Sequence, residues 1–423
     1  MRSGLPADEW KIVPLADEAA TVFSVPESAK VYLGSPTITC LPGGRIVVAV
    51  DQAGPGVAKL PGGKGQLYHS HHWVQGKIFV SQDKGQTWTQ RGEFPFCNAC
   101  LFRDGESLYL LGHRGTIEIM KSSDGGQTWG KTGELTTRDA VGSNYVQGPA
   151  NVLHAGGFIY APFMRGTKPG QRRSSSSTRA VDILRTPEGS VLTSRKSWTT
   201  LPDGPTFSDL VPVDEFDYFG VPFYGRPLSP KGKKEHTPRR LGWGDVHLLR
   251  IDDPQHIWSD SDGKSFHLLA RAAAYRGNIA ALAKVTGAGT GKLSIAPETT
   301  PAGVKQAFLS LPGGNLRFHA IFDDISGLFW LLSSQVTDSM RRSDRGQGRM
   351  RGLPCDERHR LQLHFSKNLV DWCFAGFVSI GSDRSDARND AQMAVRGDDL
   401  CVAICSGATV LCGVIPAFRD LVY

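Results

Sequence analysis

An octet of residues that occurs twice restricts the fold of this chain more than any other feature of its sequence. The residues from Ser81 to Trp88 read SQDKGQTW, and those from Ser122 to Trp129 read SSDGGQTW, 41 residues later. Each copy follows a strand-like run, at 77–80 and 117–120. Repeats of about 40 residues are typical of propeller blades or solenoid coils. Because this unit holds strands and no helix, it favours a β-propeller.

The chemistry of the octet explains why it recurs. Its Ser and Asp side chains can bond to the backbone of a tight turn, its Gly accepts a positive φ, and its Trp can bury a ring between neighbouring sheets. The octet is therefore a folding element rather than a catalytic site. Weaker copies lie at 194–198, 259–266 and 366–372, each with a serine and an aromatic residue.

These octets resemble the Asp-boxes (BNR repeats) of the sialidase superfamily, which lie at the turn between the third and fourth strands of a propeller blade. The resemblance implies an all-β fold, one β-propeller domain over residues 1–423 with four-stranded antiparallel blades. Seven blades are the preferred count and six are the alternative, because the fifth blade is weakly marked. The expected blades cover 37–94, 98–135, 148–203, 207–272, 278–314 and 318–380, and the last begins at Asp390 and is closed by a strand within 10–25.

Composition and charge narrow the class of partner. The 423 residues include 49 Gly and 25 Pro, which suits many short strands joined by tight turns. The net charge is +7, and the basic residues gather at 165–179, 226–240 and 341–351. Excess positive charge raises the local concentration of anionic partners. No zinc-finger, helix-turn-helix or RNA-binding motif is present, so an acidic carbohydrate is favoured over nucleic acid.

Neither a membrane segment nor a metal is expected. No apolar run reaches roughly 18 residues, the least that a membrane helix needs. Residues 1–18 show no signal-peptide pattern, so the protein is expected in the cytoplasm, or in a secreted or periplasmic form whose leader has been removed. Cys97 and Cys100 form a lone CxxC, without a second pair or suitably spaced histidines, so no zinc site and no cofactor are expected.

The resemblance to sialidases does not extend to their active site. Sialidases carry an Arg-Ile-Pro motif on the first inner strand, and its Arg grips the substrate carboxylate. The matching stretch at 34–38 reads GSPTI, which keeps Pro36 and lacks the Arg. Asp51 stands where sialidases often carry another Arg. The sequence therefore assigns no arginine triad, which argues against sialic acid as the substrate unless arginines elsewhere in the chain converge.

Histidine, tyrosine and arginine residues of the first three blades offer acid–base chemistry instead. Residues 68–73 read YHSHHW, and His113 lies in the stretch LGHRG at 111–115. Tyr145, Tyr160 and Arg165 follow in the third blade. Histidine titrates near neutral pH, and arginine can clamp a carboxylate. This combination is similar to that of ulvan lyases and rhamnosyl-glucuronate lyases. The similarity implies abstraction of the C5 proton of a uronate and elimination of the 4-linked sugar.

The favoured hypothesis is an enzyme that cleaves an acidic poly- or oligosaccharide by β-elimination. The expected catalytic residues are His71, His72, His113, Tyr145 and Tyr160, and the expected substrate-binding residues are Asp51, Trp73, Arg165 and Arg226. A sialidase-like glycoside hydrolase is the first alternative, and it needs two carboxyls roughly 5 to 10 Å apart. Its candidate carboxyls are Asp51, Asp209, Asp214, Glu215, Asp217 and Glu357. A carbohydrate-binding propeller without catalysis is the second alternative.

Overall fold

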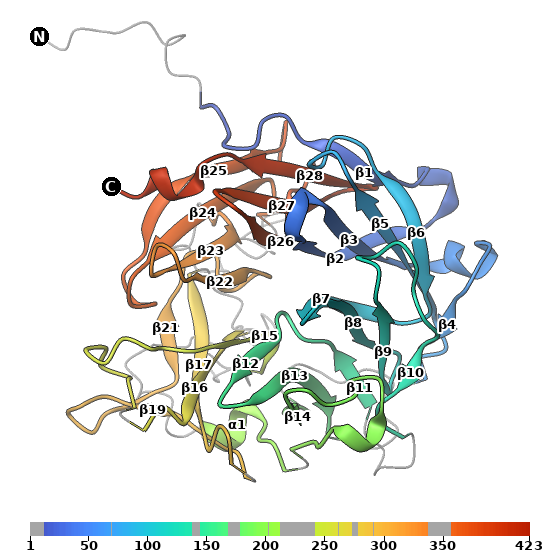
Figure 1. Ribbon diagram of the computed structural model, residues 1–423. Helices are drawn as coiled ribbons and strands as arrows, with labels where there is room; N and C mark the ends of the chain where they lie inside the picture. The colour runs from blue at the N-terminus through green and yellow to red at the C-terminus, as the bar shows by residue number, and fades with distance from the viewer. Residues whose placement is uncertain are drawn as a thin grey trace, which may run out of the picture.

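Six antiparallel sheets radiate from a common axis, which confirms the predicted all-β propeller (Figure 1). The computed structural model describes residues 12–68, 70–137, 144–167, 178–201, 203–211, 242–260, 262–272, 278–290, 292–336 and 357–423. Within these ranges α1 (Phe207–Leu210) is the one α-helix. None of the described helices has the length and hydropathy of a membrane span.

The first three blades follow one another along the chain. Blade 1 contains β2 (Tyr32–Cys40), β3 (Ile46–Ala53), β4 (Gly65–Gln66), β5 (Trp73–Ser81) and β6 (Thr89–Phe94). Blade 2 contains β7 (Cys97–Asp104), β8 (Ser107–His113), β9 (Ile117–Ser122) and β10 (Gly133–Glu134). Blade 3 contains β11 (Asn144–Gln147), β12 (Leu153–Ala155), β13 (Phe158–Gly166) and β14 (Arg179–Pro187).

The remaining three blades complete the ring. Blade 4 contains β15 (Gly244–Leu249), β16 (Ser265–Arg271), β17 (Ile279–Thr286), β18 (Ser294–Ala296) and β21 (Phe308–Ser310), beside a ribbon of β19 (Glu298–Thr299) and β20 (Lys305–Gln306). Blade 5 contains β22 (His319–Asp323), β23 (Leu328–Ser334), β24 (Arg360–Ser366) and β25 (Cys373–Ile380). Blade 6 contains β26 (Asn389–Arg396), β27 (Asp399–Ser406) and β28 (Thr409–Ile415), and β1 (Ala20–Ser24) pairs with β28 as its outer strand.

The preferred count of seven blades is corrected to six. The expected blades at 207–272 and 278–314 are one sheet, because β16 pairs with β17 along its whole length. The octet-like stretch at 259–266 misled the count. It leads from β15 into β16, between the first and second strands of blade 4, and not into a fourth strand. A Ser-Asp-Gly turn suits either connection, so its sequence alone did not reveal its place.

Packing between blades forms the core. The side chains of a strand alternate between the two faces of its sheet, and both faces of each blade are covered by a neighbour. In β3, Ile46, Val48 and Val50 join the cluster shared with blade 6, while Val47 and Ala49 join the cluster shared with blade 2. Burial on both faces explains why β3 reads as a continuous apolar run rather than an alternating one.

The two octets adopt the same hydrogen-bonded turn. Gly85 and Gly126 have φ of 96° and 87°, and each donates its N–H to the first serine of its octet over 2.8 Å. Asp124 accepts hydrogen bonds from the N–H groups of Gln127 and Thr128 and from the hydroxyls of Ser122 and Thr128.

The octet tryptophans are less buried than the sequence suggests. Trp88 and Trp129 are half-buried, and they pack against the clusters between blades 6 and 1 and between blades 1 and 2. In addition, each indole N–H donates a hydrogen bond to the carbonyl of the octet glycine, over 3.0 Å in the first turn and 3.2 Å in the second. The rings therefore close the turn as well as the seam between two blades.

Replacing Asp124 by Ala should destabilise the protein. The change removes the acceptor of four hydrogen bonds, and we expect the free energy of unfolding to fall by about 1–3 kcal/mol. D124N should cost less, because one oxygen remains, as in the 366–372 turn where Asn368 accepts from the N–H groups of Val370 and Asp371. Urea unfolding measures these changes, with S123A at the exposed Ser123 as the control. Equal midpoints for D124A and S123A would contradict the role of this turn.

Candidate functional site

The strand register distinguishes the two ends of the propeller axis. Gly34 of β2 pairs with Asp51 at the end of β3, whereas Ser81, which opens the first octet, pairs with Ile46 at the start of β3. The innermost strands therefore begin at the end of the axis opposite the octets. We call the end with Asp51 the site face and the end with the octets the octet face.

A repeated backbone feature marks the site face. Ser35, Asn98, Asp245 and Asp390 each have φ between 47° and 49°, in the innermost strands of blades 1, 2, 4 and 6. Each residue lies in a register shift of its strand. The left-handed region is uncommon for residues other than Gly, although Asn and Asp are enriched in it. Bulges of this kind redirect side chains, and here they recur around one axis.

Asp245 ties together groups from three blades. Its carboxylate accepts a hydrogen bond from the Gln147 amide, forms a 2.9 Å ion pair with Nε of Arg271 and lies 3.6 Å from Nε of Arg317. The Asp245 side chain is only 4% exposed. Burial opposes its ionisation, but Arg271 and Arg317 outweigh that effect and hold the pKa of Asp245 below its usual range. Asp245 is thus an ionised carboxylate that fixes the positions of two arginines.

Arg317 is the charged centre of the site face. Its Nη1 donates to the hydroxyl of Ser35 over 2.6 Å. Burial disfavours its charge, yet Asp245, Asp390 and Asp51 together raise the pKa of Arg317 above its usual value. Acidic side chains from blades 4, 6 and 1 therefore act together on one guanidinium group of blade 5.

Asp51 differs from Asp245 in its protonation. Its Oδ2 accepts the N–H of Asn98 over 2.5 Å, while its Oδ1 is buried without a hydrogen-bond partner in the described part of the chain. Burial raises the pKa of Asp51 to about 7, although the Asn98 N–H and Arg317 act in the other direction. Near neutral pH this carboxyl can therefore hold a proton and release it. When their surroundings give two carboxyls different pKa values, one can act as a general acid while the other stays ionised.

A cleft of about 210 Å³ opens beside Asp245 and Arg317. Three arginines and two aspartates of blades 4, 5 and 6 dominate its walls. The lining residues are Asp245, Arg271, Leu316, Arg317, Ser334, Arg358, Asn389 and Asp390. Such a concentration of guanidinium groups suits a ligand with a carboxylate, because Arg matches that group bidentately.

The structure brings part of the expected histidine set together. His71 and His72 are exposed in the turn between β4 and β5. Tyr68 of this turn donates its N–H to the carbonyl of Arg114 over 3.0 Å, which places the turn beside His113. His113 itself is 2% exposed, and its Nε2 lies 3.9 Å from Sγ of Cys97.

The two expected catalytic tyrosines lie apart. Tyr145 pairs with Arg165 across β11 and β13, and its hydroxyl donates to Oδ2 of Asp182 over 2.7 Å. Burial and then Asp182 raise the pKa of Tyr145, so the phenol stays protonated. Tyr160 is fully buried between blades 3 and 4 and its hydroxyl accepts the N–H of Gly289, toward the octet face. The structure therefore does not bring Tyr160 to the site face.

The other predicted residues have varied positions. Trp73 begins β5, with Nζ of Lys64 at 5.9 Å from its ring centre. Asp209 is exposed and caps the N-terminus of α1 through Thr206, and Glu357 is buried. Outside the described residues lie Arg226, Asp214, Glu215 and Asp217.

Sequence reasoning missed most of the charged cluster, although a signal was present. The missed residues are Asp245, Arg271, Arg317 and Arg358, and Asp390 was noted only as a strand start. Near the start of four innermost strands a tetrapeptide has a polar residue in second place and an apolar one in third: GSPT at 34–37, CNAC at 97–100, GDVH at 244–247 and NDAQ at 389–392. The segment LRFH at 316–319, which leads into β22, follows the same pattern. Aligning the blades on this pattern would have placed these polar side chains around one axis.

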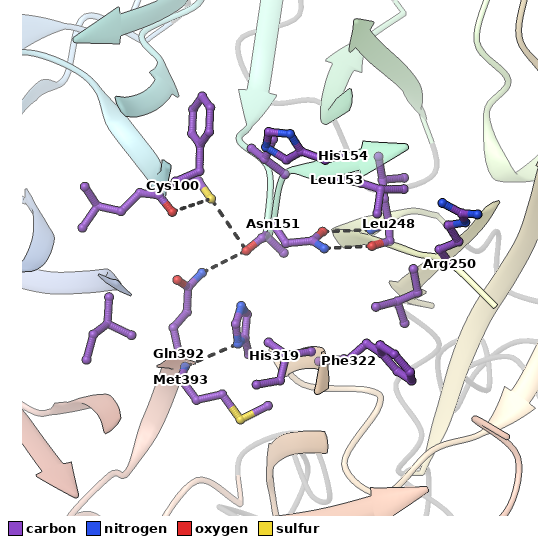
Figure 2. A pocket seen from close by; sticks show the side chains of 18 of the residues that line it. Cys100, Asn151, Leu153, His154, Leu248, Arg250, His319, Phe322, Gln392 and Met393 are labelled. Carbon is purple, nitrogen blue, oxygen red and sulfur yellow. Dashed lines mark hydrogen bonds between the residues drawn. The ribbon is translucent and has the colours of Figure 1, made fainter. Parts of the chain in front are cut away.

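A second cavity, of about 510 Å³, lies on the octet face (Figure 2). At its base, Nε2 of Gln392 donates to the carbonyl of Ala150 over 3.3 Å, and Nδ1 of His319 accepts the N–H of Met393 over 3.3 Å. Burial lowers the pKa of His319 well below its usual value, so the ring is neutral. These polar groups satisfy one another, and the arginine cluster lies elsewhere. The site-face cleft is therefore the better candidate for chemistry.

Metal chemistry finds no support in the described part of the chain. No three His, Cys, Asp or Glu side chains are grouped there so as to hold a metal ion. The seven described cysteines are free thiols.

Comparisons with known proteins bear on the fold. No protein family and no curated protein sequence matches the chain. A Hadza microbial sialidase is similar in structure, with a TM-score of 0.54 at 10% identity, over 94% of this chain and 68% of that one. A protein of unknown function from Dyadobacter fermentans has a TM-score of 0.53 at 11% identity, over 95% and 98% of the two chains.

An α-L-arabinofuranosidase from Fusarium graminearum, in complex with an iminosugar inhibitor, has a TM-score of 0.51 at 10% identity, over 96% of this chain and 99% of that one. At such identities the likeness concerns the fold alone. The chain therefore shares the β-propeller fold of these proteins, which the octets predicted, while the likeness to propeller lyases stays a prediction.

Proposed function

We propose that this protein is a glycoside hydrolase that cleaves a carboxylate-bearing sugar in the site-face cleft. One observation carries the proposal: three arginines line the cleft with the ionised Asp245, and one of them, Arg317, is also influenced by the charge of the protonatable Asp51. In this reaction Asp51 protonates the leaving oxygen, and Arg271, Arg317 and Arg358 bind the anionic group of the sugar. The sialidase and arabinofuranosidase names of fold neighbours add only that this propeller can carry such chemistry.

Hydrolysis suits the described residues better than β-elimination. An eliminating enzyme needs a base that can accept the C5 proton of a uronate. Tyr145 is held protonated by burial and Asp182, and Tyr160 lies in the core. Arg271, Arg317 and Arg358, in contrast, border a cleft, and the protonatable Asp51 acts on Arg317 from beside it. Elimination remains the second candidate because His113 and the exposed turn with His71 lie close together on the site face.

The first test is a panel of substrates read in two ways. Aryl glycosides of glucuronic, galacturonic and N-acetylneuraminic acids, and uronate-containing polysaccharides, are incubated with the wild-type protein. Hydrolysis releases the aryl alcohol or a reducing end without an unsaturated product. We expect activity on at least one anionic substrate and none on its neutral analogue. Unsaturated product would favour the lyase, and no turnover on any substrate would refute the enzyme.

The variant D51N should lose activity in proportion to the basicity of the leaving group. General acid catalysis contributes about 10²–10⁴-fold, and we expect a loss of kcat in this range for a poor leaving group such as methanol. A dinitrophenyl leaving group needs little protonation, so D51N should cleave that glycoside nearly as fast as the wild type. An equal loss on both substrates would argue against Asp51 as the proton donor.

The pH dependence follows from the direction of the Asp51 shift. The carboxyl must be protonated, so kcat/KM should fall as pH rises above about 7, and D51N should lack this alkaline limb. Stability should move in the same sense. Between about pH 4, where an unfolded Asp titrates, and pH 7, the folded state keeps a proton that the unfolded chain has lost. The melting temperature of the wild type relative to D51N should therefore fall over this window.

Changing Arg271 to Lys should weaken substrate binding. Lysine keeps the charge but loses the planar pair of donors that matches a carboxylate. We expect KM for the anionic glycoside to rise by about tenfold or more, the equivalent of about 1.4 kcal/mol. R91K, at an exposed position on β6, is the matched control. An unchanged KM in R271K would place the anionic group elsewhere.

A further inference from the structure

Two carboxylates border the site-face cleft, and they differ in how they are engaged. Asp245 is almost fully buried and is held by Gln147, Arg271 and Arg317. Each of its oxygens is already in contact with a donor, so it is poorly placed to attack a substrate. Asp390 lines the same cleft and is half-buried. Among the residues that the structure describes, no hydrogen bond or ion pair engages its side chain. Of the two, Asp390 is the carboxylate that a ligand can reach.

The backbone holds Asp390 in a fixed direction. It has φ of 49° and lies in the shift between the pairs Asn389–Cys405 and Gln392–Ala403. This conformation is strained for a residue other than glycine, and residues strained in this way cluster at functional sites. The same conformation at Asp245 directs that side chain to the arginines, which supports a common purpose for the two bulges.

Asp390 and the proposed proton donor belong to neighbouring blades and act on the same two groups. Asp390 and Asp51 both raise the pKa of Arg317, and both add to the effect of burial on the Cys405 thiol, whose pKa is raised. Both carboxyls therefore shift the pKa of the same two groups, the Arg317 guanidinium and the Cys405 thiol. Blades 6 and 1, which carry the two carboxyls, are neighbours in the ring (Figure 1). In a retaining glycosidase two carboxyls lie about 5–5.5 Å apart and one of them attacks the sugar directly, which is the arrangement required of Asp390 and Asp51 here.

We propose that Asp390 is the catalytic nucleophile, a role that rests on the proposed hydrolase function. A carboxylate oxygen of Asp390 forms a bond to the anomeric carbon while the glycosidic C–O bond breaks. The electron pair of that bond goes to the leaving oxygen, which takes the proton of Asp51. In the second step water attacks the anomeric carbon, Asp51 accepts its proton, and the ester bond to Asp390 breaks. The products are the free sugar and the alcohol, and both carboxyls return to their first state.

The variant D390G tests this role with little risk to the fold. Glycine accepts a φ of 49° without strain, and the missing side chain leaves room for a small anion. On the aryl glycoside that the wild type cleaves fastest, we expect D390G to lose kcat by on the order of 10⁴-fold. Sodium azide should restore release of the aryl alcohol, with a glycosyl azide of inverted configuration as the product. D398N is the matched control, because Asp398 belongs to the same blade and its side chain is 89% exposed.

The outcomes separate this role from the proposed function. An active wild type that retains anomeric configuration, together with azide rescue of D390G, supports Asp390 as the nucleophile. An active wild type that inverts configuration, or a D390G variant with near wild-type kcat, overturns that role and leaves the hydrolase intact. A wild type that cleaves no substrate of the panel removes the hydrolase and the nucleophile together.

Discussion

Burial of every blade on both faces is the constraint on which this structure depends. A sheet in the ring has no solvent face near the axis, so its alternating side chains must fit two neighbours at once. In β3, Val48 belongs to the cluster shared with blade 6 and Val47 to the cluster shared with blade 2. A slip of one residue would exchange the two sets. The register is therefore fixed by both interfaces together, and the strand ends are fixed with it.

Fixed strand ends allow the axis to hold charge. Where the innermost strands begin, bulges turn Asp245 and Asp390 out of the regular alternation. The arginines that meet them come from other strands, Arg271 from the end of β16 and Arg317 from the segment before β22. Charges buried in this way are costly unless they are paired and hydrogen-bonded. The pairing of Asp245 with two arginines and the Gln147 amide meets that condition and gives the cluster a single geometry.

The same burial gives the carboxyls different chemical properties. Asp51 has backbone donors and a more distant arginine, so burial dominates and its pKa rises to about 7. Asp245 is buried as deeply, but two arginines in direct contact reverse the effect. Asp390 borders the cleft and keeps an accessible carboxylate. Three aspartates on one face thus acquire three conditions from their neighbours alone, which is how a protein supplies acid and base chemistry from one residue type.

The sequence by itself determined the local structure: the octets predicted the turns, and the apolar runs predicted the strands and the propeller. These are properties of short segments, and the hydrogen bonds that the Asp124 side chain accepts all come from within the octet at 122–129. Blade count depended on which strands pair, and the stretch at 259–266 has the residues of an octet in a different connection. The site depended on contacts between residues far apart in sequence, such as Ser35 with Arg317. Only the closed ring decided which polar side chains reach the axis, because register and bulges, rather than residue type, direct them there.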